Sequence, residues 1–256
     1  MSCLCNELQS LSSDIFDWIK AQPAVKEESL TDWLLYELSK RCTNVAYKSF
    51  TRHEEAKLTG ADWDWLFVFP DGAVYLRMQA KKLSAVDDNY PGLARTNRYR
   101  QQITKLISSA NAISAFPMYA FYSDSTAPNA CQGGVSCANS GSYLCGANVV
   151  DSQLVKSRVF VSDINVLSVS YPLPCIACCT HPSGNSARSL MDQLRHYFPI
   201  AEENDSDYAS LGYLQSIPSW AKSVLDNRMQ FPEWWEGEFS RAFADTNALI
   251  IIDNRD

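Results

Sequence analysis

Acids, an amide and a lysine recur at two-residue spacing in the segment 60–83, which reads GADWDWLFVFPDGAVYLRMQAKKL. Asp62 and Asp64 begin one apolar run, and Gln79 and Lys81 end a second. Side-chain oxygens are the ligands that Mg²⁺ or Mn²⁺ takes while keeping several waters. A lysine beside such an ion can orient or deprotonate an attacking water. These residue types indicate metal-dependent phosphodiester hydrolysis; a solvated strand face with a cross-strand salt bridge is the alternative.

The two apolar runs alternate with polar residues around Asp71-Gly72, which is a strong β-hairpin signal. A two-residue loop at this position predicts a register in which Asp64 faces Gln79. In the same register Asp62 faces Lys81. One face of the strand pair is then uniformly apolar, and the other gathers its polar groups at the end far from the turn. Directly opposed side chains lie roughly 5 Å apart, so the four polar groups are expected to form one compact site.

Apolar periodicity predicts the elements that must position this hairpin. An amphipathic helix is expected at 6–20, and a second at 27–41 buries one stripe made of Leu30, Trp33, Leu34 and Leu38. A strand at 45–50 precedes the hairpin, and a helix at 98–113 and a strand at 117–122 follow it. Further elements are expected in the second half: strands at 164–171 and 248–252, and helices at 187–197 and 219–225.

This order of elements over residues 24–123 resembles the PD-(D/E)XK, or restriction-endonuclease-like, nuclease superfamily, whose core is a helix, three strands, a helix and a further strand. The resemblance implies that Asp62 is the metal-binding acid and that Gln79 and Lys81 belong to the (D/E/Q)-x-K strand. It also implies that Glu28 is the glutamate that many members place on the first helix. No proline precedes Asp62, and glutamine replaces the usual acid at position 79, as in the Mrr-like branch.

The neutral side chain at position 79 weakens the field on a metal ion, so further acids are expected to supply charge. Glu55, Asp64 and Glu28 are the candidates. Glu55 precedes Gly60-Ala61-Asp62 by a short loop and could fold back toward the ion.

Substrate contacts are expected from the helix at 98–113 and its neighbours. Gln102 occupies the position where related nucleases bring a polar group toward the backbone phosphate; an exposed helix glutamine is the alternative. Arg98 and Lys82 belong to a basic cluster beside the expected site, although a charge run is usually a solvated helix face.

Length and composition favour an α/β fold with a sizeable core, because the chain has 256 residues of which 46% are hydrophobic. We expect a restriction-endonuclease-like mixed sheet flanked by helices, with a C-terminal α+β elaboration. Residues 1–123 would form the nuclease-like core with its N-terminal helix. Residues 124–256 would form a cysteine-containing loop and the elaboration, packed on the same domain because no clean linker separates the halves.

The net charge of −7 counts against tight binding to free nucleic acid, since phosphate affinity comes largely from basic residues. The basic cluster and a bound metal ion would offset the charge locally. The sequence has neither an apolar run long enough to span a membrane nor a basic stretch followed by an apolar core at its N-terminus. We therefore expect a cytoplasmic protein with no membrane partner.

Nine cysteines in a cytoplasmic protein are expected to be free thiols rather than disulfides. Cys175, Cys178 and Cys179 with His181 have half of a zinc-ribbon spacing, and the remaining thiolates could come from Cys131, Cys137 and Cys145. Structural zinc and buried thiols that pack as small apolar groups are the two readings.

Two functions from different classes follow from this pattern. The first is a Mg²⁺- or Mn²⁺-dependent endonuclease that cuts phosphodiester bonds, with DNA as the expected substrate, in the prokaryotic antiviral defence context that the resemblance suggests. The second is a nuclease-fold module that has lost catalysis and works as a binding or regulatory partner. A protein partner or a second copy of the chain is compatible with both.

Overall fold

The computed structural model describes residues 3–50, 60–93, 98–125, 141–150, 162–179, 185–198, 211–239, 243 and 246–255, and no side chain at 98–101 or 148. The helices are α1 (Cys3–Ala21), α2 (Glu27–Arg41), α3 (Arg98–Ala112), α4 (Ala147–Val149), α5 (Asp163–Ser168), α6 (Cys175–Cys178), α7 (Ala187–Tyr197), α8 (Ser219–Asp226) and α9 (Trp235–Phe239). The strands are β1 (Val45–Ser49), β2 (Trp63–Phe69), β3 (Gly72–Lys82), β4 (Phe116–Tyr122), β5 (Ser142–Gly146), β6 (Tyr171–Pro172), β7 (Tyr213–Leu214) and β8 (Ala248–Asp253).

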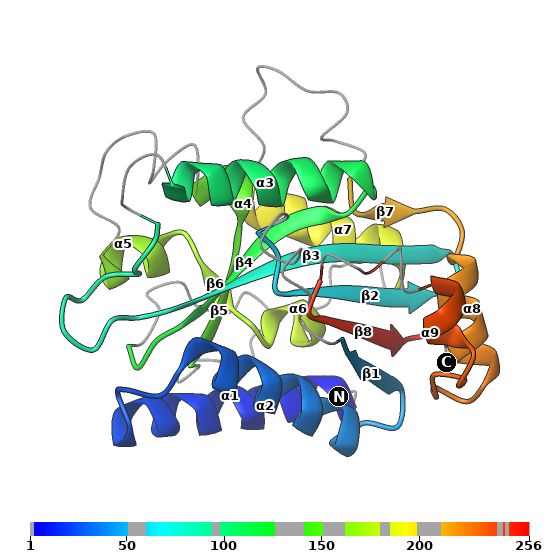
Figure 1. Ribbon diagram of the computed structural model, residues 1–256, viewed down its shortest axis with the longest axis horizontal. Helices are drawn as coiled ribbons and strands as arrows, with labels where there is room; N and C mark the ends of the chain where they lie inside the picture. The colour runs from blue at the N-terminus through cyan, green and yellow to red at the C-terminus, as the bar shows by residue number, and fades with distance from the viewer. Residues whose placement is uncertain are drawn as a thin grey trace.

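The fold is α/β, with one open mixed sheet flanked by helices (Figure 1). Strands of the described residues follow the order β1-β8-β2-β3-β4-β5-β6, and β7 pairs with the start of β3. The β2–β3 hairpin lies in the middle of the sheet. β8 runs parallel to β2 and β4 runs parallel to β3. Strands from both halves of the chain therefore share a single sheet.

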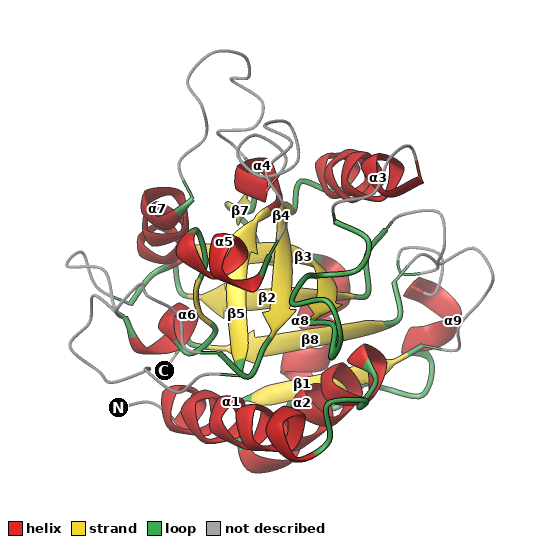
Figure 2. Ribbon diagram, turned by 90° about the vertical axis from the view of Figure 1, so that its left-hand side faces the viewer, coloured by secondary structure: helices red, strands yellow, loops and turns green. Residues whose placement is uncertain are grey.

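Two layers of helices cover the sheet (Figure 2). On one face α1, α2 and α7 pack against the apolar side of the hairpin, which carries Trp63, Trp65, Phe67, Phe69, Val74, Leu76, Met78 and Ala80. On the other face α8 and α9 pack on a second cluster that includes Leu66, Val68, Ala73 and Tyr75. The strict alternation along β2 and β3 thus serves two cores, which explains why both strands are buried throughout, except for half-buried Lys82 at the end of β3.

Helix α2 is stabilised by charged residues at its two ends and by leucines on its buried face. Glu27 and Glu28 lie in the first turn, where the helix dipole favours negative charge, and Lys40 and Arg41 lie in the last. Its buried side chains lie on the sheet-facing side: Leu30, Thr31, Leu34, Leu35 and Leu38. This packing places the first turn of α2 beside the end of β3.

The predicted order of helix, three strands, helix and strand is found along residues 27–122. The helix predicted at 27–41 is α2 with the same bounds. The segment 164–171, predicted as a strand, instead forms α5 followed by β6, so that prediction is wrong. Its short apolar run suits either structure, and Asp163 favours the helix because it lies in the first turn, where the helix dipole favours negative charge. The buried Asp163 carboxylate also accepts hydrogen bonds from the hydroxyls of Tyr90 and Ser123.

The predicted hairpin register is also wrong, by two residues. Phe69 pairs with Gly72, so the loop is Pro70-Asp71 rather than Asp71-Gly72. Gly72 has φ +145° and lies against β7, where a Cβ would come within 2.3 Å of the Leu214 carbonyl oxygen. A shift of two residues leaves both faces as predicted, because side chains alternate with period two.

Helix α1 is joined to α6 by a disulfide between Cys5 and Cys178. The expectation that no disulfide forms is therefore wrong, and Cys178 does not offer a thiolate for a zinc ribbon in this structure. Cys131, Cys137 and His181 lie outside the described residues.

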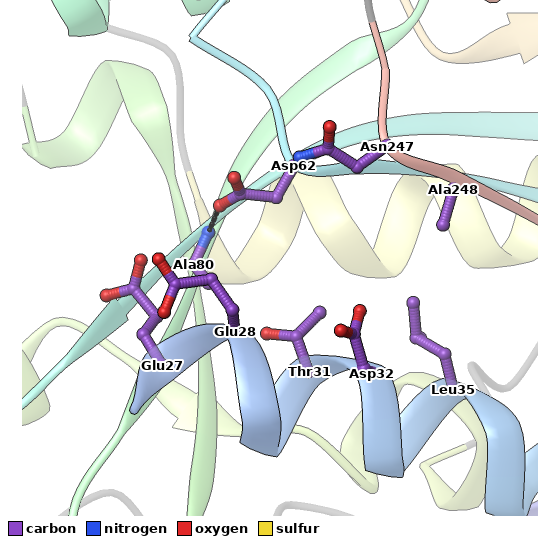
Figure 3. A pocket seen from close by; sticks show the side chains of 9 residues that line it. All are labelled: Glu27, Glu28, Thr31, Asp32, Leu35, Asp62, Ala80, Asn247 and Ala248. Carbon is purple, nitrogen blue, oxygen red and sulfur yellow. Dashed lines mark hydrogen bonds between the residues drawn. The ribbon is translucent and has the colours of Figure 1, made fainter. Parts of the chain in front are cut away.

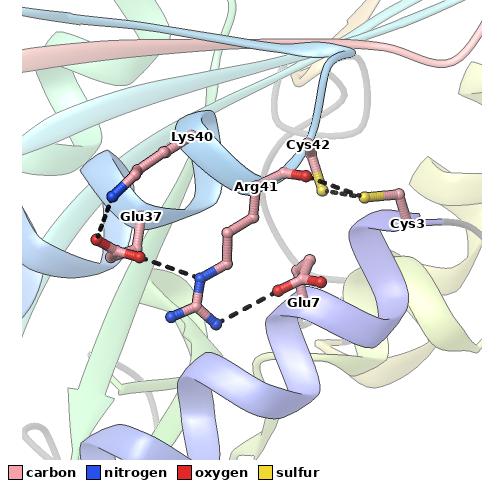
Figure 4. Close-up of polar contacts among 6 residues, drawn as sticks. All are labelled: Cys3, Glu7, Glu37, Lys40, Arg41 and Cys42. Atoms are coloured by element: carbon pink, nitrogen blue, oxygen red, sulfur yellow. Dashed lines mark hydrogen bonds and ion pairs between the residues drawn. The ribbon is translucent and has the colours of Figure 1, made fainter.

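The N-terminus of α1 also meets the C-terminus of α2 (Figure 4). The sulfur atoms of Cys3 and Cys42 lie 2.7 Å apart, and burial raises the pKa of the Cys42 thiol to about 12. Arg41 bridges the helices, with Nη1 at 3.4 Å from Glu7 and Nε at 3.1 Å from Glu37. None of the described helices has the length and apolar character needed to cross a bilayer.

Candidate active site

A pocket opens between α2 and the adjoining ends of the central strands (Figure 3). It is lined by Glu27, Glu28, Thr31, Asp32, Leu35, Asp62, Ala80, Asn247 and Ala248. The first turns of α2 supply Glu27, Glu28 and Asp32. Asp62 immediately precedes β2, and Ala80 lies near the end of β3. Thr31 rests on the buried Tyr122, their hydroxyl oxygens 3.0 Å apart.

Asp62 is held at the entrance to β2 by the backbone of β3. Its amide donates to the carbonyl of Met78 at 2.8 Å, and its Oδ2 accepts from the amide of Ala80 at 2.8 Å. Oδ2 also accepts a short hydrogen bond from Nε2 of Gln79. In the observed register Asp62 therefore lies across from Gln79, and not from Lys81 as predicted.

Lys81 meets the first residue of α2. Its ammonium lies 3.7 Å from Oε1 of Glu27, and the amide of Lys82 donates to Oε2 of the same carboxylate at 2.8 Å. Lys81 is buried, with 8% of its surface exposed, so its charge faces an acid instead of bulk water. Lys81 does not itself line the pocket of Asp62, but it pairs with Glu27, which does.

Glu27 is strongly affected by this environment. Burial raises its pKa from 4.5 to about 7, against the opposing effect of Lys81, and the charge of Asp62 adds to the rise. One carboxylate thus interacts electrostatically with both Lys81 and Asp62. Proton exchange near neutral pH at this position is the kind of chemistry that general acid–base catalysis uses.

Glu28 lines the same pocket one residue further along α2, and Asp32 lies one helical turn after it. Glu28 and Asp32 are both exposed. Of the residues predicted as catalytic, Asp62 and Glu28 line the pocket. Gln79 is hydrogen-bonded to Asp62, and Lys81 pairs with Glu27, which lines the pocket together with Asp32.

Asp64, predicted as a metal ligand, is placed elsewhere. Its two oxygens accept from Nε and Nη2 of Arg77, each at 2.9 Å, and Oδ2 also accepts from the hydroxyl of Tyr75 at 3.1 Å. The pair is buried in the sheet, and Asp64 does not line the pocket. The two-residue register shift is the reason, because it sets Asp64 opposite Arg77.

The predicted substrate contacts have three different outcomes. Gln102 donates from Nε2 to Oε1 of Gln79 at 2.8 Å, so it faces the site. Lys82 turns away and donates to the carbonyls of Pro23, at 2.7 Å, and Leu83, at 3.0 Å. Arg98 begins α3, and its side chain is not described. Glu55, the second-rank metal ligand, lies outside the described residues.

Sequence reasoning missed Glu27, Asp32 and Asn247. A signal existed for the first two, because Asp32 follows Glu28 by four residues and so shares its helix face, and Glu27 adjoins it. No sequence signal pointed to Asn247. It reaches the pocket only because β8, from the far end of the chain, lies beside β2.

The donor set suits a hydrated divalent cation. Oxygens of Asp62, Glu28 and Asp32 surround one pocket, and Mg²⁺ is commonly held by one or two carboxylates while it keeps several waters. Among the described residues, no three Asp, Glu, His or Cys side chains converge as a preassembled metal site. These carboxylates therefore fit an open cation site that water and substrate would complete. They do not fit a closed structural metal site.

Residues 4–256 match the model of a family of unknown function, DUF6615, and the chain belongs to that family. No curated protein and no solved structure matches it.

Proposed function

We propose that this member of the DUF6615 family is a metal-dependent nuclease with a restriction-endonuclease-like core, hydrolysing phosphodiester bonds in DNA. The observation that carries the proposal is that Asp62 and the acids of α2 line one pocket, with Lys81 paired to one of those acids, Glu27. The order of elements along residues 27–122 supports it. In the sheet, β8 lies between β1 and β2, and Asn247, the residue before β8, lines the pocket.

Asp62 and Glu28 would hold the cation, with Asp32 in reach of its waters. A bound Mg²⁺ or Mn²⁺ supplies positive charge to a phosphate oxygen and acidifies a water. Lys81 orients the attacking water and offsets negative charge that develops on the phosphorus oxygens. Glu27 holds Lys81 in place and, with a pKa of about 7, can take up the proton that the water releases.

A catalytically inactive binding or regulatory module is the second candidate. Gln79 favours it, since the (D/E/Q)-x-K position bears no charge here and its amide donates to Asp62. The net charge of −7 points the same way. Such a module would use the same surface to hold a protein partner or a second copy of the chain.

The deciding experiment incubates the purified chain with supercoiled plasmid, linear duplex and RNA in Mg²⁺, Mn²⁺ or EDTA. A nuclease cleaves at least one substrate with a metal and none in EDTA, and Asp62→Asn abolishes the cleavage. Lys81→Met should also strongly slow the cleavage. Lys48→Met is the matched control for that lost lysine, because Lys48 pairs with Glu236 outside the pocket. No cleavage by the parent under any condition would favour the binding module.

A further inference from the structure

A chain of two glutamine side chains connects α3 to Asp62. Gln102 donates from Nε2 to Oε1 of Gln79 at 2.8 Å, and Gln79 donates from Nε2 to Oδ2 of Asp62. The same Nε2 donates to the carbonyl of Ala80 at 3.0 Å. Gln79 is 3% exposed, so its amide is fixed by these partners and not by solvent.

The carboxylate of Asp62 determines the donor and acceptor of each hydrogen bond between Gln102, Gln79 and Asp62. A carboxylate can only accept, so Gln79 must turn its NH₂ group toward Asp62. Its oxygen then faces α3, where only a donor satisfies it, and Gln102 supplies that donor. Turning the amide of Gln79 by half a rotation would set its oxygen against Asp62 and its NH₂ against the donor of Gln102.

Gly60 keeps α3 close enough for this contact. It has φ +71°, and a Cβ at this position would lie 2.7 Å from the carbonyl oxygen of Gln102 and 3.2 Å from its Cγ. The backbone two residues before Asp62 therefore lies directly against Gln102. Helix α3 therefore contacts the start of the hairpin in two ways. Gln102 packs against Gly60 and is hydrogen-bonded to Gln79.

We infer that Gln79 is a positioning residue for Asp62 and that Gln102 acts through Gln79. Position 79 then supplies a donor to the cation-binding acid, in place of the oxygen ligand that an Asp or Glu would supply. Hydrogen bonds to a ligating carboxylate hold its geometry and tune its affinity for metal. The inference rests on the proposed function, since it concerns the cation that Asp62 would bind.

The test measures Mn²⁺ binding by the whole chain without nucleic acid, from the electron paramagnetic resonance signal of free Mn²⁺. Gln79→Met is expected to weaken binding by roughly 10–100-fold, the usual effect of losing such an outer partner. Gln102→Met should weaken it less. The double variant should bind no more weakly than Gln79→Met, because the described hydrogen bonds lead from Gln102 to Asp62 through Gln79.

Gln193→Met is the matched control, because it removes another amide that donates to a backbone carbonyl, that of Cys175 at 3.0 Å, outside the pocket. It should leave Mn²⁺ affinity unchanged, and thermal unfolding in EDTA would verify that all variants are folded. Unchanged or tighter binding by Gln102→Met would overturn the inference and leave the nuclease proposal standing, as would additive losses in the double variant. Failure of the parent to bind Mn²⁺ would overturn both.

Discussion

Arg77 and Asp64 form a two-bonded ion pair within the central hairpin, with the guanidinium Nε and Nη2 each 2.9 Å from a carboxylate oxygen. Their side chains are 1% and 0% exposed. Nη1 of Arg77 also donates to the carbonyl of Ser109 on α3, at 3.4 Å. The pair therefore links the hairpin to the helix that carries Gln102.

We predict that Asp64→Ala lowers the free energy of unfolding by about 3–5 kcal/mol, because it leaves a buried guanidinium without its counter-ion. Replacing both partners, as in Asp64→Leu with Arg77→Met, should cost less than the sum of the single changes. Urea unfolding of Asp64→Ala, Asp64→Leu, Arg77→Met and the double variant measures this. Mn²⁺ affinity of the folded Asp64→Ala protein should stay at the parent value; a large loss would restore Asp64 as a metal ligand.

The proposed chemistry makes Asp62 and Lys81 act at one step. Asp62→Asn and Lys81→Met should each lower the rate of plasmid cleavage by at least about 100-fold, the usual scale for a positioned electrostatic or acid–base group. The double variant should be hardly slower than either single one. Single-turnover cleavage rates give the comparison, with thermal unfolding as the check on folding. Undiminished cleavage by Lys81→Met would rule out its role with the water.

Much of this site can be predicted from the sequence. The rest depends on tertiary contacts, which the sequence pattern does not reveal. The alternation in β2 and β3 correctly predicts which side chains lie on each face of the hairpin. An error of two residues in the register does not change the faces, because side chains alternate with period two. The partners of Asp62 and Asp64 could not be predicted, since the loop position depends on Gly72 lying against β7. Likewise, the helix pattern places acids at the start of α2 but does not tell which of Glu27 and Glu28 faces Lys81.

The raised pKa of Glu27 predicts how stability depends on pH. Its pKa rises from 4.5 to about 7 on folding, so between these values the native state binds the proton more tightly than the unfolded state. This contribution to stability is complete below pH 4.5 and is lost as the pH rises through about 7. In EDTA, Glu27→Gln should therefore gain in melting temperature relative to the parent between pH 5 and pH 8. A difference that stays constant with pH would show that Glu27 keeps an ordinary pKa.

The disulfide predicts a redox-dependent stability. It joins Cys5 to Cys178 across 173 positions, and loss of a native disulfide typically costs about 2–5 kcal/mol. Cys5→Ser with Cys178→Ser should lower the melting temperature. A thiol reductant should bring the parent down to the same value while leaving the double variant unchanged. Equal effects of the reductant on both proteins would mean that this pair is not oxidised in solution.

The last prediction concerns a carboxylate at position 79. Gln79→Glu would set an acid against Oδ2 of Asp62, where the structure requires a donor. Without metal the two like charges should repel, so the melting temperature in EDTA should fall below that of the parent. A divalent cation would relieve the repulsion and bind the folded state more tightly, so saturating Mn²⁺ should raise the melting temperature of Gln79→Glu by more than that of the parent. Gln193→Glu controls for an added buried charge away from the pocket and should show no such gain from Mn²⁺. A variant as stable as the parent in EDTA would show that Asp62 does not depend on the amide of Gln79.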